Sequence, residues 1–456
     1  MNRESYESSA ERDSMTDTEP TRDKYNIAYI IFFIAGAGSL LPWNFFCTAI
    51  PYFQYKLRNT FAANTTAELS PEQALFGNYL ALCSMLPLAL FNILNLVLVK
   101  WISAFLRFIV GSVVVFLMLL LTVILVYLEL GAQLFLGITL CSVVIINSAA
   151  AIIQGSLLGI ASVLPPRNIR AFLEGQASSG VIAAVAQILS LAGSSLITNS
   201  AFAYFLVALV FLGLSTALTL SLKRNAHFRY YWKAESTHQT KEEKSKDKDA
   251  SASGLSADTL DTLVESNDER KTSPLAKSLL KSLGEMWVHG CCVMITLMFT
   301  LMLFPALLQP IKSMIDDAEN VWASRFFIPV IVFLSFNVFD WIGRTLAGFI
   351  KWPRVSQRWI LLGLCLARMI FVPLCMFMNQ QPRKHLPVVF LHDAYPIILV
   401  ILLGLTNGYF VSLGMTYGPS FASPGTNESA GAALSIYMSL GLSFGVAVSA
   451  GLALAI

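Results

Sequence analysis

The chain has 456 residues, of which 55% are hydrophobic and only 13% are charged, and its mean hydropathy is +0.64. Soluble globular proteins contain about 25% charged residues, so this composition argues against a soluble enzyme or binding domain. The net charge of +3 is small and no basic-aromatic patch accompanies it, which argues against nucleic-acid binding.

Long apolar runs follow one another along the chain, and each is long enough to cross a bilayer as a helix. Such a helix needs about 20 apolar residues, whereas the strands of a membrane barrel alternate apolar and polar residues over about 10 positions. The sequence therefore predicts an all-α polytopic membrane protein with 11 transmembrane helices. The predicted spans begin near Asn26, Ala74, Phe105, Gln133, Ala171, Ala201, Trp287, Arg325, Trp359, Pro387 and Ala430.

Lys and Arg residues near the span ends predict the orientation, because positively charged loops tend to stay in the cytosol. With a cytosolic N-terminus, eleven Lys and Arg residues fall in the short cytosolic pieces and six fall in the outside loops. The odd number of spans then places the C-terminus outside. The sequence thus predicts a multi-pass membrane protein with its N-terminus in the cytosol and its C-terminus outside.

One long hydrophilic segment of mixed charge divides the spans into six and five. We expect a cytosolic tail over 1–25, an N-terminal bundle over 26–222, a disordered cytosolic loop over 223–283 and a C-terminal bundle over 284–456. A layout of two bundles is typical of secondary transporters whose substrate site lies between them.

Two kinds of covalent modification are suggested by short motifs. The acceptor sequence Asn-Thr-Thr at Asn64 lies in the first outside loop, so we expect a glycan there. A similar motif at Asn427 falls on the predicted cytosolic side, and we expect none. In the long loop, Ser273 follows Arg-Lys-Thr and is a candidate for phosphorylation, with an unmodified solvated loop as the alternative.

No residue pattern indicates metal binding or catalysis. All seven cysteines lie in apolar spans, where a thiol usually acts as a small hydrophobic group. No Cys/His cluster has metal-ligand spacing, and we find neither a catalytic constellation nor a Gly-rich phosphate loop. We therefore expect no metal, no cofactor, no enzymatic activity and no obligate protein partner.

Polar side chains inside the predicted spans are costly, and they indicate where function resides. Asp340 and Arg344 are spaced i and i+4 on one helix face, roughly 16 Å from the cytosolic boundary at 1.5 Å per residue. A carboxylate beside a forked donor suits the vicinal hydroxyls of a sugar. A structural ion pair that clamps two helices is the alternative, and the two roles are compatible.

Gln154 lies at a similar depth in the fourth span. Its amide offers a donor and an acceptor to the edge of a nucleobase, with an interhelical hydrogen bond as the alternative. Trp43, toward the outer end of the first span, either stacks on a planar base or anchors the helix at the interface.

Other polar or small residues in the spans are expected to be structural first. Arg368 is expected to pair with Asp340 or with a backbone carbonyl, with contact to the substrate as the alternative. Glu174 is expected to be solvated near the cytosolic face. Gly175 is expected to bring helices together and, secondarily, to leave room for a ligand.

Eight short motifs occur in order along the spans. They are LLPWNFF from Leu40, LPL from Leu86, QGSL from Gln154, GQ from Gly175, FPA from Phe304, FN from Phe336, DWIGR from Asp340 and NGY from Asn407. Together they resemble the equilibrative nucleoside transporter family (solute carrier family 29), close to its animal plasma-membrane type 1 and type 2 members. The resemblance covers nearly the whole chain outside the first two dozen residues and the long loop.

The resemblance implies a major-facilitator-like arrangement of eleven spans and sodium-independent, facilitative transport of nucleosides such as adenosine and uridine by alternating access. It implies that Gln154 hydrogen-bonds the base while Asp340 and Arg344 engage the ribose. Further cavity residues implied in the same way are Trp43, Met85, Leu88 and Asn337, and the implied outer gate comprises Cys47, Phe304 and Pro305.

Three positions depart from the type 1 pattern of that family. Cys47 stands where the pattern has Met, Glu174 replaces a small residue, and Ala150 replaces a Gly one turn before Gln154. The added bulk of Ala150 intrudes on the cavity, which argues against strong binding of bulky benzyl-purine inhibitors. Gly175 is a second residue expected to shape that inhibitor pocket.

The residues by themselves indicate only that something polar binds near the bilayer midplane. A facilitator for another small solute, such as a nucleobase, a sugar or an organic cation, is therefore the alternative function. A seven-span receptor does not fit eleven spans. Saturable flux with counterflow would exclude a simple pore.

Overall fold

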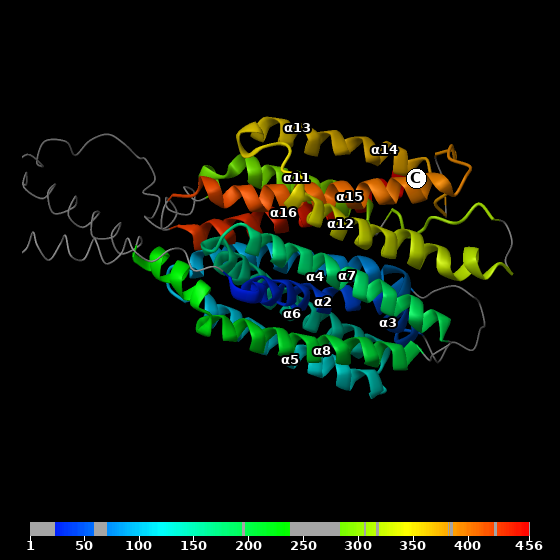
Figure 1. The fold of residues 1–456 in the computed structure, drawn as a ribbon. Helices are drawn as coiled ribbons and strands as arrows, with labels where there is room; N and C mark the ends of the chain where they lie inside the picture. Colours follow the sequence, from blue (N-terminus) through cyan, green and yellow to red (C-terminus); the bar gives the residue numbers. More distant parts are fainter. Residues whose placement is uncertain are drawn as a thin grey trace, which may run out of the picture.

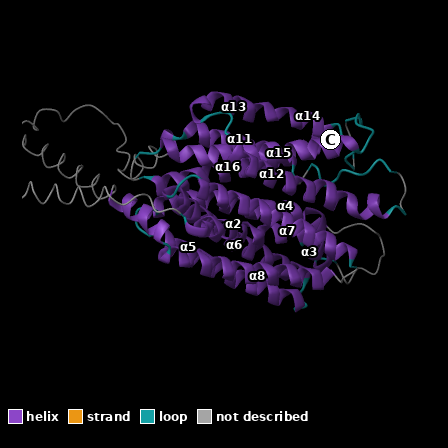
Figure 2. Ribbon diagram, viewed as in Figure 1, coloured by secondary structure: helices purple, strands orange, loops and turns teal. Residues whose placement is uncertain are grey.

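The computed structural model describes residues 23–58, 71–193, 197–237, 283–304, 307–315, 319–381, 383, 386–423 and 426–455. Helix dominates these ranges (Figure 2). Within them, strand-like pairing is limited to one isolated bridge between Ile311 and Gln380.

The helices of the first half cover the six predicted N-terminal spans. They are α2 (Ile27–Thr48), the short α3 (Ile50–Lys56), α4 (Pro71–Leu98), α5 (Ala104–Tyr127), α6 (Ala132–Val163), α7 (Arg167–Ala192) and α8 (Ile197–Ser221). The helices of the second half are α11 (Trp287–Leu303), α12 (Ser335–Phe349), α13 (Arg358–Ala367), α14 (Phe371–Met376), α15 (Ala394–Tyr417) and α16 (Asn427–Ala455).

The predicted number of spans is confirmed. In the ranges given above, ten helical segments are long and apolar enough to cross a membrane, and α11 adds a shorter apolar helix of 17 residues. The start of the tenth span was predicted least accurately, because α15 begins at Ala394 and not near Pro387. Pro396 sits in the first turn of α15, where a missing N–H costs no helical hydrogen bond.

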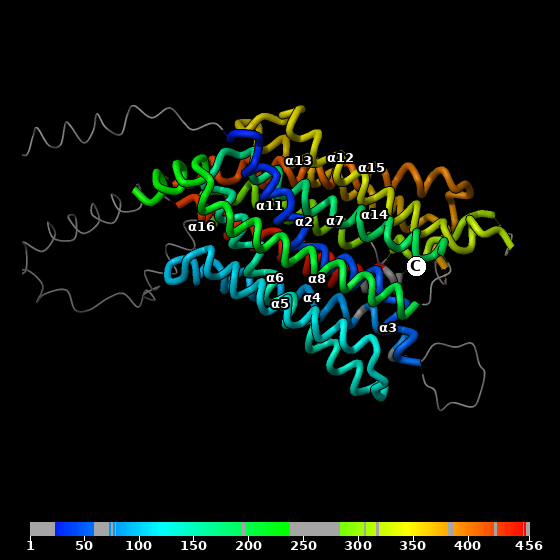
Figure 3. The backbone as a smooth tube through the Cα atoms, turned by 60° about the horizontal axis from the view of Figure 1, so that its bottom comes forward, coloured from blue at the N-terminus to red at the C-terminus, as the bar shows by residue number. Residues whose placement is uncertain are grey.

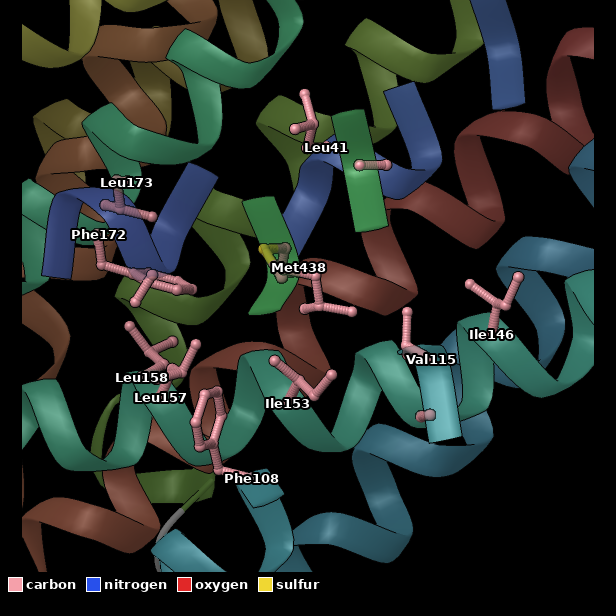
Figure 4. Packing of buried hydrophobic residues seen from close by; sticks show 14 of the residues in the cluster. Leu41, Phe108, Val115, Ile146, Ile153, Leu157, Leu158, Phe172, Leu173 and Met438 are labelled. Atoms are coloured by element: carbon pink, nitrogen blue, oxygen red, sulfur yellow. The ribbon is translucent and has the colours of Figure 1, made fainter. Parts of the chain in front are cut away.

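The helices pack as two groups that follow the chain (Figures 1 and 3). In the first group α2 packs on α7 and α8, and α6 packs on α4 and α5; in the second, α12 packs on α15, and α11 on α15 and α16. The groups meet where α16 packs on α4 and α6 and where α12 packs on α7. Figure 4 shows part of the core at this junction, in which Ile153 and Leu157 of α6 share one apolar cluster with Phe108 of α5 and Met438 of α16.

The expected disordered loop begins differently from the prediction. Residues 226–237 are helical, and Phe228 and Trp232 of this helix pack against the ring of Phe105. Glu235 accepts hydrogen bonds from the backbone and side chain of Asn427, both at 3.0 Å. The prediction of disorder from residue 223 is therefore wrong for this stretch, because its aromatic residues have an apolar surface to cover. Residues 238–282 lie outside the described residues.

Glu174 is buried, contrary to the prediction that it is solvated. The residue is 6% exposed, and its carboxylate accepts a hydrogen bond from the hydroxyl of Tyr29 and lies 3.4 Å from Nε of Arg170. The reason is that α2 packs over this turn of α7 and excludes water from it. An acidic side chain near a span end can thus be enclosed when a neighbouring helix supplies a donor.

Helices α2 and α7 approach each other most closely at two glycines. A Cβ atom on Gly36 would lie 2.0 Å from the carbonyl oxygen of Phe172, and one on Gly175 would lie 1.9 Å from that of Phe33. The backbones therefore touch at both positions, as small residues allow in membrane helices. The structural role predicted for Gly175 has a clear physical basis here, whereas Gly175 is absent from the cavity wall described below.

Candidate functional site

A cavity of about 190 Å³ lies where the two groups of helices meet. Its wall is built from α2, α4 and α6–α8, with a small contribution from α5, on one side and from α11, α12, α15 and α16 on the other. All seven residues expected to contact a substrate belong to this wall: Trp43, Met85, Leu88, Gln154, Asn337, Asp340 and Arg344. Ala150 and Phe304 also line the cavity.

Helix α12 presents its polar groups to the cavity after an unusual stretch of chain. Two π-helical stretches, Trp322–Phe326 and Ile328–Leu334, precede α12 and widen the helix before Ser335. Such stretches are rare and occur often at functional sites. In α12 itself, the buried face carries both Asp340 and Arg344.

Asp340 and Arg344 form the ion pair predicted from their spacing. Nε of Arg344 donates to Oδ2 of Asp340 at 2.9 Å. Both residues are buried: Arg344 is 7% exposed and Asp340 is 4% exposed. Nη1 of Arg344 also donates to the carbonyl oxygen of Leu173 in α7, at 2.9 Å. The pair thus faces the cavity and at the same time links the second group of helices to the first.

Gln154 lies at the opposite wall, beside an apolar surface. Met85, Leu88 and Ala151 form a small buried cluster against which Trp43 packs. Among the described residues, the side-chain amide of Gln154 has no hydrogen-bond partner, although the residue is buried. A buried amide without a protein partner is costly, so a ligand that offers a matching edge would be held there.

Asn337 and Phe304 occupy the second group's side of the cavity. Nδ2 of Asn337 donates to the carbonyl oxygen of Phe333 at 2.8 Å, while its Oδ1 faces Gly180 of α7. The ring of Phe304 stacks on that of Phe336 with centroids 4.1 Å apart and planes 12° apart. The stacked pair is the aromatic boundary of the cavity.

Some predicted positions lie elsewhere. Cys47 is half-buried near the end of α2 and is not part of the cavity wall. Pro305, Asn64 and Ser273 lie outside the described residues, so their predicted roles in gating, glycosylation and phosphorylation stay predictions.

Several polar residues of the cavity wall, among them Asn407 and Thr300, were not predicted from the sequence as site residues. Asn407 donates to Oδ1 of Asp340 at 2.6 Å, and the Thr300 hydroxyl lies 2.7 Å from Oδ1 of Asn407. Arg368 binds the carbonyl oxygen of Thr296 at 2.6 Å, one of the two kinds of partner predicted for it. The available signal was a polar residue in an apolar span, which identifies candidates without saying which face of the helix they occupy.

Comparison with known proteins decides the family. The family profile described as "Nucleoside transporter" matches residues 140–453. The chain belongs to this family. It is 37% identical to equilibrative nucleoside transporter 1 of Homo sapiens and 36% identical to equilibrative nucleoside transporter 2 of Homo sapiens, in both cases over 95% of this chain and 98% of the relative. It is 35% identical to equilibrative nucleoside transporter 3 of Rattus norvegicus, over 94% of this chain and 89% of the relative.

A solved structure places the nucleoside transporter fold seen here among major-facilitator-like folds. The crystal structure of the human organic anion transporter MFSD10 matches with a TM-score of 0.51 at 13% sequence identity, over 95% of each chain. At this identity the likeness concerns the arrangement of helices alone. As a member of the nucleoside transporter family with eleven apolar helices, the chain is a multi-pass membrane protein.

Proposed function

We propose that this chain carries nucleosides across the membrane down their concentration gradient, without sodium, by exposing its cavity alternately to the two sides. The proposal rests on the residues that line the cavity, in a chain that belongs to the nucleoside transporter family. The cavity wall combines an unpartnered amide, an apolar slot and a buried carboxylate–guanidinium pair. Relatives named equilibrative nucleoside transporters, similar over nearly the whole chain, support it.

The wall suits the two halves of a nucleoside differently. The base would lie against Trp43, Met85 and Leu88, with Gln154 bonding its polar edge, because the faces of a planar base stack on aromatic and apolar side chains while its edge needs hydrogen-bond partners. The ribose hydroxyls would reach Asp340 and Arg344, which offer charged acceptors and donors.

Contacts between the two groups of helices support a rocking movement around this site. Besides the bond from Arg344 to Leu173, an ion pair between Arg107 of α5 and Glu428 of α16 joins the groups. Ribose hydroxyls that donate to the free acceptor sites of Asp340 would weaken its bond with Arg344 and so the link of α12 to α7. Substrate binding would thereby favour rearrangement of this contact, because a ligand shifts an equilibrium when it binds one of two states more tightly.

We place the protein in the plasma membrane with its N-terminus in the cytosol and its C-terminus outside. The distribution of Lys and Arg supports this orientation. In Figure 3, α2 begins at the end of the helix array that also holds the helix of residues 226–237, and α16 ends at the opposite end. The loop after α8 would then face the cytosol.

The proposal is tested by uptake of radiolabelled uridine and adenosine into transport-deficient cells, at two pH values and with and without sodium. We expect saturable uptake with counterflow that needs no sodium, and no uptake of glucose or choline. Saturable transport of glucose or choline, with none of either nucleoside, would contradict the proposal.

Replacing Gln154 by Ala should weaken adenosine recognition without loss of folded protein. Loss of a hydrogen bond of about 1–1.5 kcal/mol raises KM for adenosine by about tenfold. Uptake kinetics should be normalised to surface transporter measured by biotinylation. An unchanged KM with less surface protein would show that Gln154 serves helix packing instead.

Ala150→Gly should tighten the binding of benzyl-purine nucleoside inhibitors by about tenfold, because it removes a methyl group from the cavity wall beside Gln154. One buried methyl group is worth about 1 kcal/mol or slightly more in such a site. Inhibition of uridine uptake measures it. Ala151→Gly is the matched control. It lowers the helix propensity of α6 by the same amount, but at a residue outside the cavity wall. Equal inhibition of both variants would contradict the role of Ala150.

A further inference from the structure

Three side chains lead from Asp340 away from the cavity and into the second group of helices. Nδ2 of Asn407 donates to Oδ1 of Asp340 at 2.6 Å, the hydroxyl of Thr300 lies 2.7 Å from Oδ1 of Asn407, and Nη2 of Arg368 donates to the hydroxyl oxygen of Thr300 at 2.9 Å. All four residues are buried. They come from α12, α15, α11 and the 3₁₀ turn Arg368–Ile370 between α13 and α14.

The hydrogen bonds in this chain of residues all run in one direction. An ionised carboxylate only accepts, so the amide NH2 of Asn407 must face Asp340 and its carbonyl must face Thr300. A guanidinium only donates, so the hydroxyl oxygen of Thr300 accepts from Arg368. The single hydroxyl proton of Thr300 can then be donated to the carbonyl oxygen of Asn407. The hydroxyl of Thr300 also lies 2.9 Å from the carbonyl oxygen of Thr296, which accepts from Nη1 of Arg368 at 2.6 Å as well, so its proton is shared between that carbonyl and the closer Oδ1 of Asn407 at 2.7 Å. Donors aligned in this way polarise and strengthen one another.

Arg368 is an expensive residue for a purely structural position. It is 2% exposed, and within the described part of the chain no carboxylate oxygen lies within ion-pair distance of it. Its remaining donors reach the hydroxyl of Thr406 and the carbonyl oxygen of Leu403, both at 3.1 Å. A buried charge without a direct counter-charge is strongly unfavourable, whereas an apolar residue would pack the same space at lower cost.

The positive charge of Arg368 acts through the hydrogen bonds on the carboxylate of Asp340, which lies at their other end. Asn407 holds Oδ1 of Asp340 and Arg344 holds Oδ2, so rotation of the carboxylate about its Cβ–Cγ bond is blocked from both sides. Each oxygen keeps one further acceptor site. Asn407 and Thr300 themselves belong to the cavity wall, so the held carboxylate is presented where a ligand binds.

We propose that Arg368, Thr300 and Asn407 form a positioning relay that orients Asp340 for the vicinal 2′- and 3′-hydroxyls of a ribose, so that the relay sets selectivity for ribonucleosides over dideoxynucleosides. The inference rests on the proposed transport of nucleosides. Asn407 and Thr300 act through Asp340, and Arg368 acts through Thr300 without reaching the cavity wall.

The test compares two substitutions at Thr300. Thr300→Val keeps the shape and removes the hydroxyl, whereas Thr300→Ser keeps the hydroxyl. The measurement is the ratio of KM for 2′,3′-dideoxyuridine to KM for uridine, in cells, normalised to surface transporter. We expect a ratio well above one in the unaltered protein, a fall of about tenfold in Thr300→Val, and recovery of most of the ratio in Thr300→Ser. Thr296→Val is the matched control, since its hydroxyl lies one turn away and outside the relay.

Each outcome decides the inference. A merely structural role would reduce the amount of surface transporter and leave the ratio unchanged in Thr300→Val, which would overturn the relay. If Thr300→Val does not reach the surface, Thr300→Ala removes the same hydroxyl and makes the same test. Unaltered protein that transports both nucleosides with equal KM overturns the relay but leaves the proposed function standing, whereas saturable transport of neither overturns the proposed function itself.

Discussion

Asp340→Asn is expected to lower uridine uptake per surface transporter by about a hundredfold or more. The substitution keeps the shape of the side chain but removes the charge that Arg344 and Asn407 both contact. It leaves a buried guanidinium without its counter-charge, which costs about 3–5 kcal/mol, and it removes the strongest acceptor offered to a ribose. Uptake kinetics and thermal stability of the detergent-solubilised protein measure the two effects separately.

A double variant separates the substrate role of Asp340 from its structural role. Asp340→Asn combined with Arg344→Met removes both charges of the pair, so stability should recover part of its loss because the guanidinium of Arg344 is no longer buried without its carboxylate. Uridine uptake should stay low, because neither charged partner for the ribose is present. Normal uptake by Asp340→Ala and Arg344→Ala proteins at the cell surface would show that the pair is only a helix clamp.

Gly175→Ala is expected to have the largest effect on folding. The new Cβ atom would lie 1.9 Å from the carbonyl oxygen of Phe33, well below the 3.0 Å that real Cβ atoms keep, and the obstacle is backbone, which cannot rotate away. Helices α2 and α7 would have to separate along a contact that Gly36 also shapes. Overpacking of this kind costs about 1–3 kcal/mol or more. We expect little surface protein and a clearly lower thermal midpoint in detergent.

Gly137→Ala in α6 is the control for this substitution. A Cβ at Gly137 meets nothing within 4 Å, so the same change there should gain the usual helix propensity of Ala, about 1 kcal/mol. Thermal midpoints of the two variants, measured side by side, should move in opposite directions. A midpoint for Gly175→Ala equal to that of the unaltered protein would mean that the two helices can part without cost.

The candidate site was predicted where a single helix contains the relevant geometry. Asp340 and Arg344 are four residues apart, so the 3.6-residue period of the helix alone brings them together. Asn407 was visible only as part of a motif, and Thr300 drew no attention, because their importance depends on α15 and α11 lying against α12. Glu174 was misjudged for the same reason: the hydroxyl of Tyr29 reaches it from another helix.

The membrane-spanning helices of the described residues follow from the sequence, because lipid forces every long apolar run to satisfy its backbone hydrogen bonds internally as a helix. Run length and composition are local properties that need no partner. Tertiary structure alone decided which polar side chains share the cavity, since that depends on the rotation and spacing of helices hundreds of residues apart. The close contact of α2 with α7 and the line of donors from Arg368 to Asp340 are consequences of that packing.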